Sequence, residues 1–429
     1  STEKHSMPSE LDNDELRLQE FVYSDKFVEV NQKENKSSLL FTIVKQLSTG
    51  KDIYRIPVPA FVLDSQSFLE KYARFWQPST NTVNLCAVKN PFDRFMNVVK
   101  NFLCMSRKMN SKSLRRSKPY NAILGETFYS YYDMKDGSRI RFFAEQVSHH
   151  PPITAFVVEN EKNQWYHSEY FKANMKYRLN TITVKVKGTR RLHLLPYGEV
   201  YEIKSPCVCL RGLLKGKAHL EVVEDLIVTC NKLPYKAEIK FAHKSDEIKG
   251  KIINLDDKKT LCTFSGDFTD SIKVTDKKTK KTSELYNVKA MKDNYMHVKP
   301  VYQQLSNESR KVWHNVTYNI KLDNNKEATI QKNIVEDKQR DLRKSEAAKG
   351  IKESDWKPVY FELDDEKHWV YKHEGEFVLS KFDFDDQEGD SDEVTKKLKE
   401  YNLKHKNDIS LQEEESSDDE DTDDEDADG

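Results

Sequence analysis

The chain has 429 residues with a formal net charge of −1, and 37% of them are hydrophobic, which is enough to bury a substantial core. It contains no run of 18 apolar residues and does not begin with the apolar segment of a signal peptide, so we expect neither a membrane-spanning helix nor secretion. We therefore expect a cytoplasmic protein whose six cysteines are reduced core residues.

The near-zero net charge hides two oppositely charged parts. Residues 413–429 hold 12 carboxylates and no Lys or Arg, which leaves 70 Lys and Arg against 59 Asp and Glu in the preceding 412 residues. Such a basic body suits anionic membrane surfaces. Nucleic acid is a weaker alternative, because the basic residues are not clustered with aromatic residues. We expect a polar to acidic tail over 386–429 that is disordered from about residue 408, since it has nothing apolar to bury.

Residues 1–35 are polar and aperiodic and predict a disordered leader. A short amphipathic helix is predicted over 36–50, where the apolar residues follow helical spacing at Leu39, Leu40, Ile43, Val44 and Leu47. About three turns are too few for a stable isolated helix, so this helix must pack on the rest of the protein. Two further helices are expected, one from about Ser65 to Trp76 and one that starts at Pro91.

From about Thr127 to Val274 the hydrophobic pattern changes to a period of two. The clearest segments are 139–147, 153–158, 181–187, 199–209, 220–229, 237–243 and 260–268. So many strands at short spacing predict a large antiparallel sheet, and closure of such a sheet can enclose a ligand cavity. Helical character returns from about Leu305 to Lys349, with Gly350 placed as the C-terminal cap. The sequence therefore predicts an α+β fold, in which a nearly closed antiparallel β-barrel over about 127–274 is flanked by N- and C-terminal helices.

The most informative motif is Glu-Gln-Val-Ser-His-His-Pro-Pro at residues 145–152. Pro151 fixes its own φ and disfavours a helical conformation at His150, so the two imidazoles are held in an extended segment. Adjacent side chains of a plain strand point to opposite faces, so a site that uses both His149 and His150 needs a turn or bulge near Ser148. Paired imidazolium groups suit a phosphate, although an isolated His-His pair is more often an ordinary surface feature.

A second motif, Lys-Pro-Tyr-Asn-Ala-Ile-Leu-Gly-Glu, occupies residues 118–126, and a third set of residues recurs every four positions at Lys332, Glu336 and Arg340. Residues four apart lie on one stripe of an α-helix, so these three side chains can face one ligand. The same spacing is also typical of an ordinary salt-bridge ladder on a solvated helix.

These three motifs, in this order, resemble those of the oxysterol-binding-protein-related family of lipid-transfer proteins. The resemblance continues through Trp356, Pro358, Phe361 and Trp369, and the chain departs from the family pattern with Tyr120 in place of Leu and Ala122 in place of Pro. It implies one lipid-binding domain over 36–385, with a lid at about 36–50, a barrel around a lipid tunnel and a C-terminal helical part at about 300–385. It is similar to the short members of the family.

The resemblance implies which residues surround the head group of phosphatidylinositol 4-phosphate at the tunnel mouth: Lys118, Asn121, His149, His150, Lys332, Glu336 and Arg340. It also implies a second lipid, sterol or phosphatidylserine, which competes for the same tunnel, and no cofactor. We expect a monomer that visits anionic membranes peripherally. The region around Phe21 loosely resembles the motif that tethers relatives to endoplasmic-reticulum receptors.

Two other classes of function remain open on the residues alone. An enzyme that uses the histidines with zinc or in phosphoryl transfer is disfavoured, because no third ligand has metal-site spacing and the chain has neither a P-loop nor a Gly-x-Ser-x-Gly elbow. A phosphoinositide-dependent sensor or tether that binds without net transport is the other alternative.

Overall fold

The computed structural model describes residues 63–78, 84–107, 118–149, 151–178, 181–188, 190–204, 206–211, 219–242, 245–322, 324–351 and 356–384. The expected leader with Phe21 and the acidic tail lie outside these ranges, as do the expected lid residues Leu39, Leu40, Ile43, Val44 and Leu47. Within the described ranges, every helix is too short or too polar to cross a bilayer.

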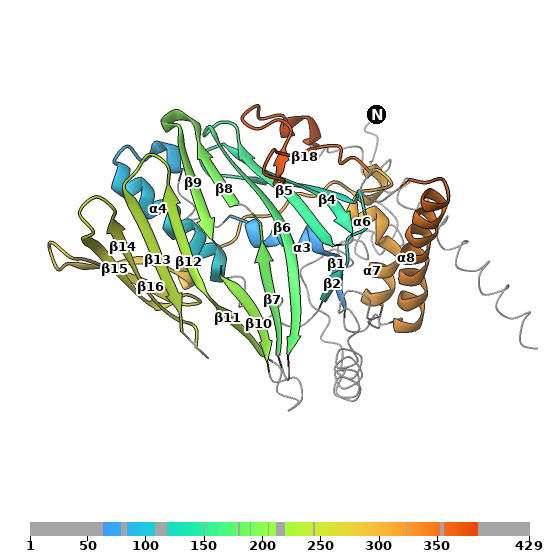
Figure 1. The fold of residues 1–429 in the computed structure, drawn as a ribbon, viewed down its shortest axis with the longest axis horizontal. Coiled ribbons are helices and arrows are strands. Elements are labelled where there is room, and N and C mark those ends of the chain that lie inside the picture. Colours follow the sequence, from blue (N-terminus) through green and yellow to red (C-terminus); the bar gives the residue numbers. More distant parts are fainter. Residues whose placement is uncertain are drawn as a thin grey trace, which may run out of the picture.

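Most of the described chain forms one large antiparallel sheet (Figure 1). Its strands in chain order are β3 (Thr127–Asp133), β4 (Arg139–His149), β5 (Pro152–Asn160), β6 (Trp165–Arg178), β7 (Thr181–Lys187), β8 (Arg190–Leu194), β9 (Glu199–Lys204), β10 (Cys207–Arg211), β11 (His219–Val223), β12 (Asp225–Cys230), β13 (Tyr235–Phe241), β14 (Glu247–Asn254), β15 (Thr260–Asp267), β16 (Ser271–Asp276) and β17 (Thr282–Asn287). This confirms the large antiparallel sheet predicted from the sequence.

The order of the strands is simpler than their number suggests. β7 and β8 run in one register along β6, and they behave as a single long strand with one interruption. β9 with β10, and β11 with β12, are interrupted in the same way. Counted like this, the sheet has twelve strands, each paired with the next one along the chain. It extends to Asn287, beyond the predicted limit near Val274, and includes β6, which the hydrophobic pattern did not single out.

The free edge of the first strand is covered by the segment that follows β17. Tyr131 of β3 exchanges two main-chain hydrogen bonds with His297, and the N–H of Thr127 donates to the carbonyl of Asn307. An uncovered edge strand would offer unpaired main-chain groups to other chains. Within the described residues, no ladder joins the first strand to the last one, and the segment after β17 makes only isolated bridges to β3. The lid and the enclosed lipid tunnel remain predictions.

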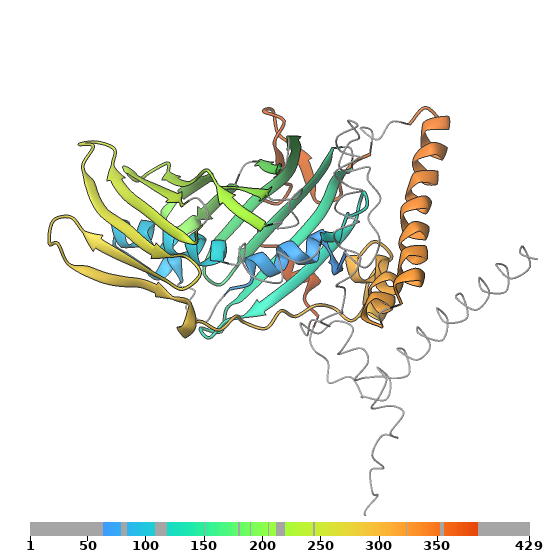
Figure 2. The same ribbon diagram turned by 90° about the horizontal axis from the view of Figure 1, so that it is seen from below.

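Two helices, α3 (Phe68–Trp76) and α4 (Pro91–Ser106), pack on the inner face of the sheet (Figure 2). The prediction that α4 begins at Pro91 is confirmed, and the Asn90 side chain caps it by accepting from the N–H of Asp93. The other predicted helix begins at Phe68 and not at Ser65. Its expected first turn belongs to β1 (Leu63–Ser67), which pairs in parallel with β2 (Lys118–Tyr120).

Strands β3 to β5 are buried on both faces. Along β5, Phe156 and Val158 join the inner core, whereas Ala155 and Val157 join a separate outer cluster. The outer cluster is completed by the C-terminal segment 356–384, which contains β18 (Phe361–Leu363) and β19 (Trp369–Tyr371). We call residues 356–384 the strap. The helical part expected to continue to about residue 385 therefore ends earlier, because the strap is a covering layer with extended segments and one short 3₁₀ turn.

The C-terminal helices form a block beside this end of the sheet: α6 (Ser309–Val312), α7 (His314–Lys321) and α8 (Asn325–Ala348). Asn324 caps the start of α8, and Gly350 follows its end with φ +77°, which confirms the predicted C-terminal cap. Single-turn 3₁₀ helices occur at η3 (Leu85–Ala87), η5 (Leu195–Tyr197), η7 (Val288–Ala290), η8 (Val301–Gln303) and η10 (Leu379–Phe382).

The strap is held by acidic side chains as well as by apolar contacts. Asp383 accepts hydrogen bonds from Arg141 and Tyr129. Glu159, which is 2% exposed, accepts the N–H of Leu379 at 2.9 Å. Burial raises the pKa of Glu159 to about 7, against the partial opposing effects of that hydrogen bond and of Arg141.

This pKa predicts that Glu159 makes the protein less stable as the pH rises. Between the unfolded pKa of about 4.5 and the folded value of about 7, the native state binds more protons than the unfolded state, so the contribution of Glu159 falls across this window and is then constant. We expect the difference in unfolding free energy between wild type and Glu159→Gln to change by up to about 3 kcal/mol from pH 4.5 to 7.5. Urea unfolding across this range measures the difference, and a constant difference would contradict the prediction.

Candidate functional site

The loop at residues 118–126 is fixed by its aromatic residue. Tyr120 is 2% exposed, stacks on Trp313 with ring centroids 4.8 Å apart, and shares a hydrogen bond of 3.1 Å with Thr317. Leu63 and Val316 complete this cluster, which joins β1 and β2 to α7. Tyr120, one of the departures from the family pattern, is therefore a packing residue at the base of the loop.

A buried carboxylate at the end of the loop links it to the helical block. Glu126 has no exposed surface and accepts hydrogen bonds from Ser67, from Ser309 at 2.7 Å and from Trp313 Nε1 at 3.0 Å. It also accepts the N–H of Ile123 at 3.0 Å, within its own loop. Glu126 belongs to the 118–126 motif, but no role was predicted for it from the sequence. Its position directly after a turn glycine and before a strand was the available signal for a buried, loop-fixing acid.

Gly125 allows the loop to approach the strap. Its φ is +77°, and a Cβ at this position would lie 3.0 Å from the ring of Trp356. Its N–H donates to the carbonyl of Gln146, and its own carbonyl accepts from the side chain of Asn307. A side chain here would strain the backbone and collide with Trp356, so glycine is required.

The histidine motif reaches the same loop at the end of β4. The β4–β5 register shifts between Gln146 and Ser148, which is the irregularity that the sequence called for, and Ser148 Oγ donates to the carbonyl of Pro151 at 2.7 Å. His149 Nδ1 lies 3.3 Å from the carbonyl oxygen of Ala122. A carbonyl only accepts, so Nδ1 carries the proton of this hydrogen bond, and Nε2 can donate to an anion only when the ring is an imidazolium. His150 lies outside the described residues.

The strap holds this motif from behind. The carboxylate of Glu145 is buried and accepts the N–H groups of Val359 at 2.8 Å and Tyr360 at 3.0 Å. The same burial raises the pKa of Glu145, while the two N–H groups oppose the shift. The Trp356 ring thus lies against the 118–126 loop, and the N–H of Val359 binds Glu145 of the histidine motif. One short segment of the strap supports both motifs.

The third motif contributes two charged groups next to the loop. Lys332 on α8 is 8% exposed and forms an ion pair of 2.9 Å with Glu336. Lys118 is near both residues: its pKa is lowered to about 8, first by burial and then by the positive charge of Lys332, while Glu336 acts in the opposite direction. Among the described residues, Lys118 has no hydrogen-bond or ion-pair partner. The arrangement is a pair of neighbouring ammonium groups with one carboxylate close to both, which favours an anionic ligand.

Two of the predicted site residues are placed differently. Arg340 is exposed and pairs with Asp337 on its own helix, and not with Glu336. It lies eight residues after Lys332, so the two are separated by about 12 Å along the helix axis. Asn121 is exposed at the surface of the loop. Lys118, Lys332 and Glu336 therefore lie together, and His149 at the end of β4 contacts the loop that follows Lys118. Arg340 is farther along α8 and pairs with Asp337.

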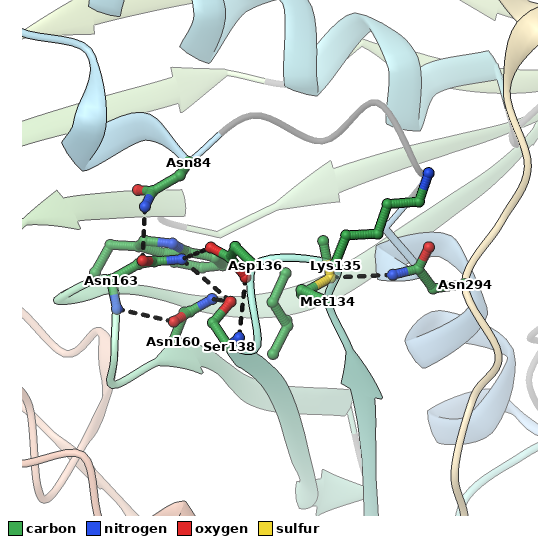
Figure 3. A pocket seen from close by; sticks show the side chains of 10 residues that line it. Asn84, Met134, Lys135, Asp136, Ser138, Asn160, Asn163 and Asn294 are labelled. Atoms are coloured by element: carbon green, nitrogen blue, oxygen red, sulfur yellow. Dashed lines mark hydrogen bonds between the residues drawn. The ribbon is translucent and has the colours of Figure 1, made fainter.

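A small, partly open pocket lies elsewhere, at the opposite end of β4 (Figure 3). It has a volume of about 160 Å³ and is bordered by Asn84, Asp136, Ser138 and Asn163, whose side chains are joined by hydrogen bonds. Because these polar groups already satisfy one another, the pocket has little to offer a ligand. In the ranges that the structure describes, no three His, Cys, Asp or Glu side chains gather as metal ligands do.

Comparison with known proteins places this geometry in a family. The oxysterol-binding protein family model matches residues 40–377. Human oxysterol-binding protein-related protein 8 is 32% identical over 357 residues, which are 80% of this chain but only 39% of that protein. The oxysterol-binding protein-like protein OBPalpha of Candida albicans is 28% identical, and the match covers 84% of each chain.

Solved structures show the same fold at lower sequence similarity. The ORD domain of Osh1 in complex with ergosterol has a TM-score of 0.64 at 21% identity, covering 85% of this chain and 94% of that domain. The ORD of Osh3 in complex with PI(4)P, from Saccharomyces cerevisiae, has a TM-score of 0.58 at 21% identity, covering 77% of this chain and 89% of that domain. With a family model that spans most of its length, this chain belongs to the oxysterol-binding protein family.

Proposed function

We propose that this protein extracts phosphatidylinositol 4-phosphate from one membrane and exchanges it for a second lipid, sterol or phosphatidylserine, from another. The observation that carries the proposal is the position of Lys118, a largely buried ammonium beside Lys332 on a loop that His149 also contacts. A phosphate monoester carries about two negative charges and several acceptor oxygens, so it can accept hydrogen bonds from all of these donors.

The comparisons support the cargo. Relatives of the same fold are described in complex with PI(4)P, with ergosterol and with cholesterol. Transfer of a chain of about 16 methylenes into water costs on the order of 13 kcal/mol, so exchange without a carrier is slow. A protein that shields one lipid at a time from water removes that barrier, and no covalent step is needed. The exchange requires transient, peripheral contact with both membranes from the cytoplasm.

In this proposal each group has a separate role. Lys118, His149 and His150 donate to the 4-phosphate, Lys332 supplies a cation to phosphate or inositol oxygens, and Glu336 accepts from inositol hydroxyls while it orients Lys332. Asn121 and Arg340 complete the head-group site. Because Arg340 pairs with Asp337 in the structure, its participation requires that ion pair to open.

We expect His149→Ala with His150→Ala to abolish phosphoinositide extraction and to leave the fold intact, since the turn lies at the surface end of β4. Extraction of the labelled lipid from liposomes measures the loss, and circular dichroism with thermal unfolding checks the fold. Full extraction by a folded double variant would overturn the assignment.

Lys118 predicts a pH dependence of its own. Its charge is about nine-tenths present at pH 7 and about one-tenth present at pH 9, so affinity for a soluble short-chain phosphoinositide should fall about tenfold across this range. Lys118→Arg keeps its charge and should remove this decrease, whereas any contribution from the histidines is common to both proteins. Titration calorimetry at pH 7, 8 and 9 tests the prediction, and equal pH dependence in both proteins would refute it.

The alternative of a sensor or tether without transport predicts binding but no transfer. A two-liposome assay that follows phosphoinositide in one direction and sterol or phosphatidylserine in the other separates the two functions. Mass spectrometry of lipids that copurify with the protein then identifies the second cargo, because sterol and phosphatidylserine differ in mass and in polar head.

A further inference from the structure

Consecutive strands of the sheet are antiparallel, so every second turn lies at the same end. The turns at residues 134–138, 231–234, 255–259 and 277–281 lie at one end, whereas the β4–β5 turn, which follows His149, lies at the other. Figure 1 shows strands β12 to β16 on the far side of the molecule from α8. We call the last three of these four turns the basic turns, and they are remote from the proposed head-group site.

The basic turns are neighbours. The N–H of Leu255 donates to the carbonyl of Pro234 at 2.7 Å, and the N–H of Lys277 donates to the carbonyl of Leu261 at 2.9 Å. Neighbouring strands lie about 4.8 Å apart, so successive hairpins are about 10 Å apart and the three turns span about 20 Å. They therefore form one continuous edge of the molecule.

This edge has a strong excess of positive charge. Its acids are Asp256 and Asp257, with Asp276 directly before the last turn. Against them stand seven exposed lysines, at Lys232, Lys258, Lys259, Lys277, Lys278, Lys280 and Lys281. Among the described residues, none of the four lysines at 277–281 forms an ion pair.

The aspartates of the basic turns are occupied by the turns themselves. Asp276 accepts from the N–H and hydroxyl of Thr279, at 2.6 and 2.9 Å. Asp257 accepts the N–H of Lys259 and pairs with its ammonium at 3.1 Å. Local turn chemistry therefore explains the aspartates, whereas no described residue neutralises the lysines of the last turn.

The strap ends at the same end of the sheet. The carbonyl of Phe384 accepts a hydrogen bond from Tyr131 Oη at 2.9 Å, and Asp383 pairs with Arg139 at 3.1 Å. Arg139 lies opposite Asp133, where the β3–β4 hairpin turns. The chain therefore leaves the strap beside the β3–β4 turn, at the end of the sheet that carries the basic turns.

The sequence after the strap contains the most acidic run of the chain. Residues 413–429 hold 12 carboxylates and no Lys or Arg, and the 28 residues 385–412 join this run to the strap. A stretch of that length reaches at most about 95 Å. Twelve strands at a spacing of about 4.8 Å measure about 53 Å from the first to the last, so each basic turn is within reach.

We propose that the acidic run at residues 413–429 docks on the basic turns of the same chain. The charges are complementary, and flexible lysine point charges bind carboxylates without the fixed geometry that the planar fork of arginine imposes. The head-group site is a weaker competitor for this run, because Lys332 is only 8% exposed and lies near the other end of the sheet. Docking neutralises the basic turns in the free protein, so another anionic partner must displace the acidic run before it binds there.

The test measures how fast each lysine of the full chain is acetylated by a water-soluble succinimidyl ester, with mass spectrometry as the readout. Wild type is compared with a neutral-run variant, in which each Glu of residues 413–429 is replaced with Gln and each Asp with Asn. The control positions are Lys240, Lys249 and Lys273, which are exposed on the same strands and, among the described residues, form no ion pair. Circular dichroism with thermal unfolding checks that both proteins are folded.

We expect Lys258 and the four lysines at 277–281 to react about fourfold more slowly in wild type than in the neutral-run variant at low salt. Each exposed ion pair contributes a factor of up to about five, and the linker holds the acidic run at an effective concentration of about 1 mM. The control lysines should react at nearly the same rate in both proteins, and 0.5 M salt should remove the protection.

Three outcomes would overturn the proposal. Equal rates at the basic turns in the two proteins would show that the run does not dock. Equal protection of the control lysines would reveal a diffuse charge effect, and protection of Lys118 and Lys332 alone would place the run at the head-group site. Lys118→Met should leave the protection of the basic turns unchanged, so this measurement is independent of the proposed lipid exchange.

A second measurement distinguishes docking within one chain from docking on a second copy. Unlabelled and ¹⁵N-labelled full chains are mixed in equal amounts and treated with a zero-length carbodiimide, which joins lysines to carboxylates in contact. Cross-links between residues 413–429 and the basic turns should join peptides of the same isotope. An equal share of mixed-isotope cross-links would assign the run to a second copy and contradict the proposal.

Discussion

The geometry of the proposed head-group site depends on one buried carboxylate. Glu126 accepts hydrogen bonds from Ser67 of β1, from Ser309 of α6, from Trp313 at the start of α7 and from Ile123 in its own loop. It therefore fixes the loop that follows Lys118 relative to α6 and α7, the helices that precede α8. Removal of this acceptor would leave buried donors unsatisfied, at a cost of about 1–3 kcal/mol for each. Burial raises the pKa of Glu126 and the donors lower it, so the same contacts that hold the loop also make the buried charge tolerable.

This rigid support explains how two ammonium groups can be kept close together. Burial and the nearby charge of Lys332 lower the pKa of Lys118, and Glu336 acts in the opposite direction. A flexible loop would relax by moving Lys118 into water, whereas the loop between Tyr120 and Glu126 is packed at both ends. An anionic ligand between the two ammonium groups would remove their repulsion, so this repulsion favours binding of an anion.

The sequence predicted those elements whose signals are local. The start of α4 follows from Asn90 and Pro91, and the strands with one apolar face follow from their period of two. β6 was missed because its buried positions include His167 and Glu169. His167 pairs with Glu169, which in turn accepts from Tyr72 of α3 and Arg190 of β8. The grouping of charged residues at the proposed site has the same limit. Motif spacing predicted one stripe on α8, but it did not indicate which residues of the stripe would lie near Lys118.

The twelve-strand order has a consequence for how the protein can vary. Since alternate turns lie at opposite ends, the turns at residues 231–234, 255–259 and 277–281 lie at the end of the sheet opposite to the β4–β5 turn. Substitutions of charged residues in those turns then act on the β4–β5 turn through a field that decays within about 8 Å at physiological salt, far less than the length of the sheet. Charges in those distant turns can therefore change without altering the electrostatics of the proposed head-group site.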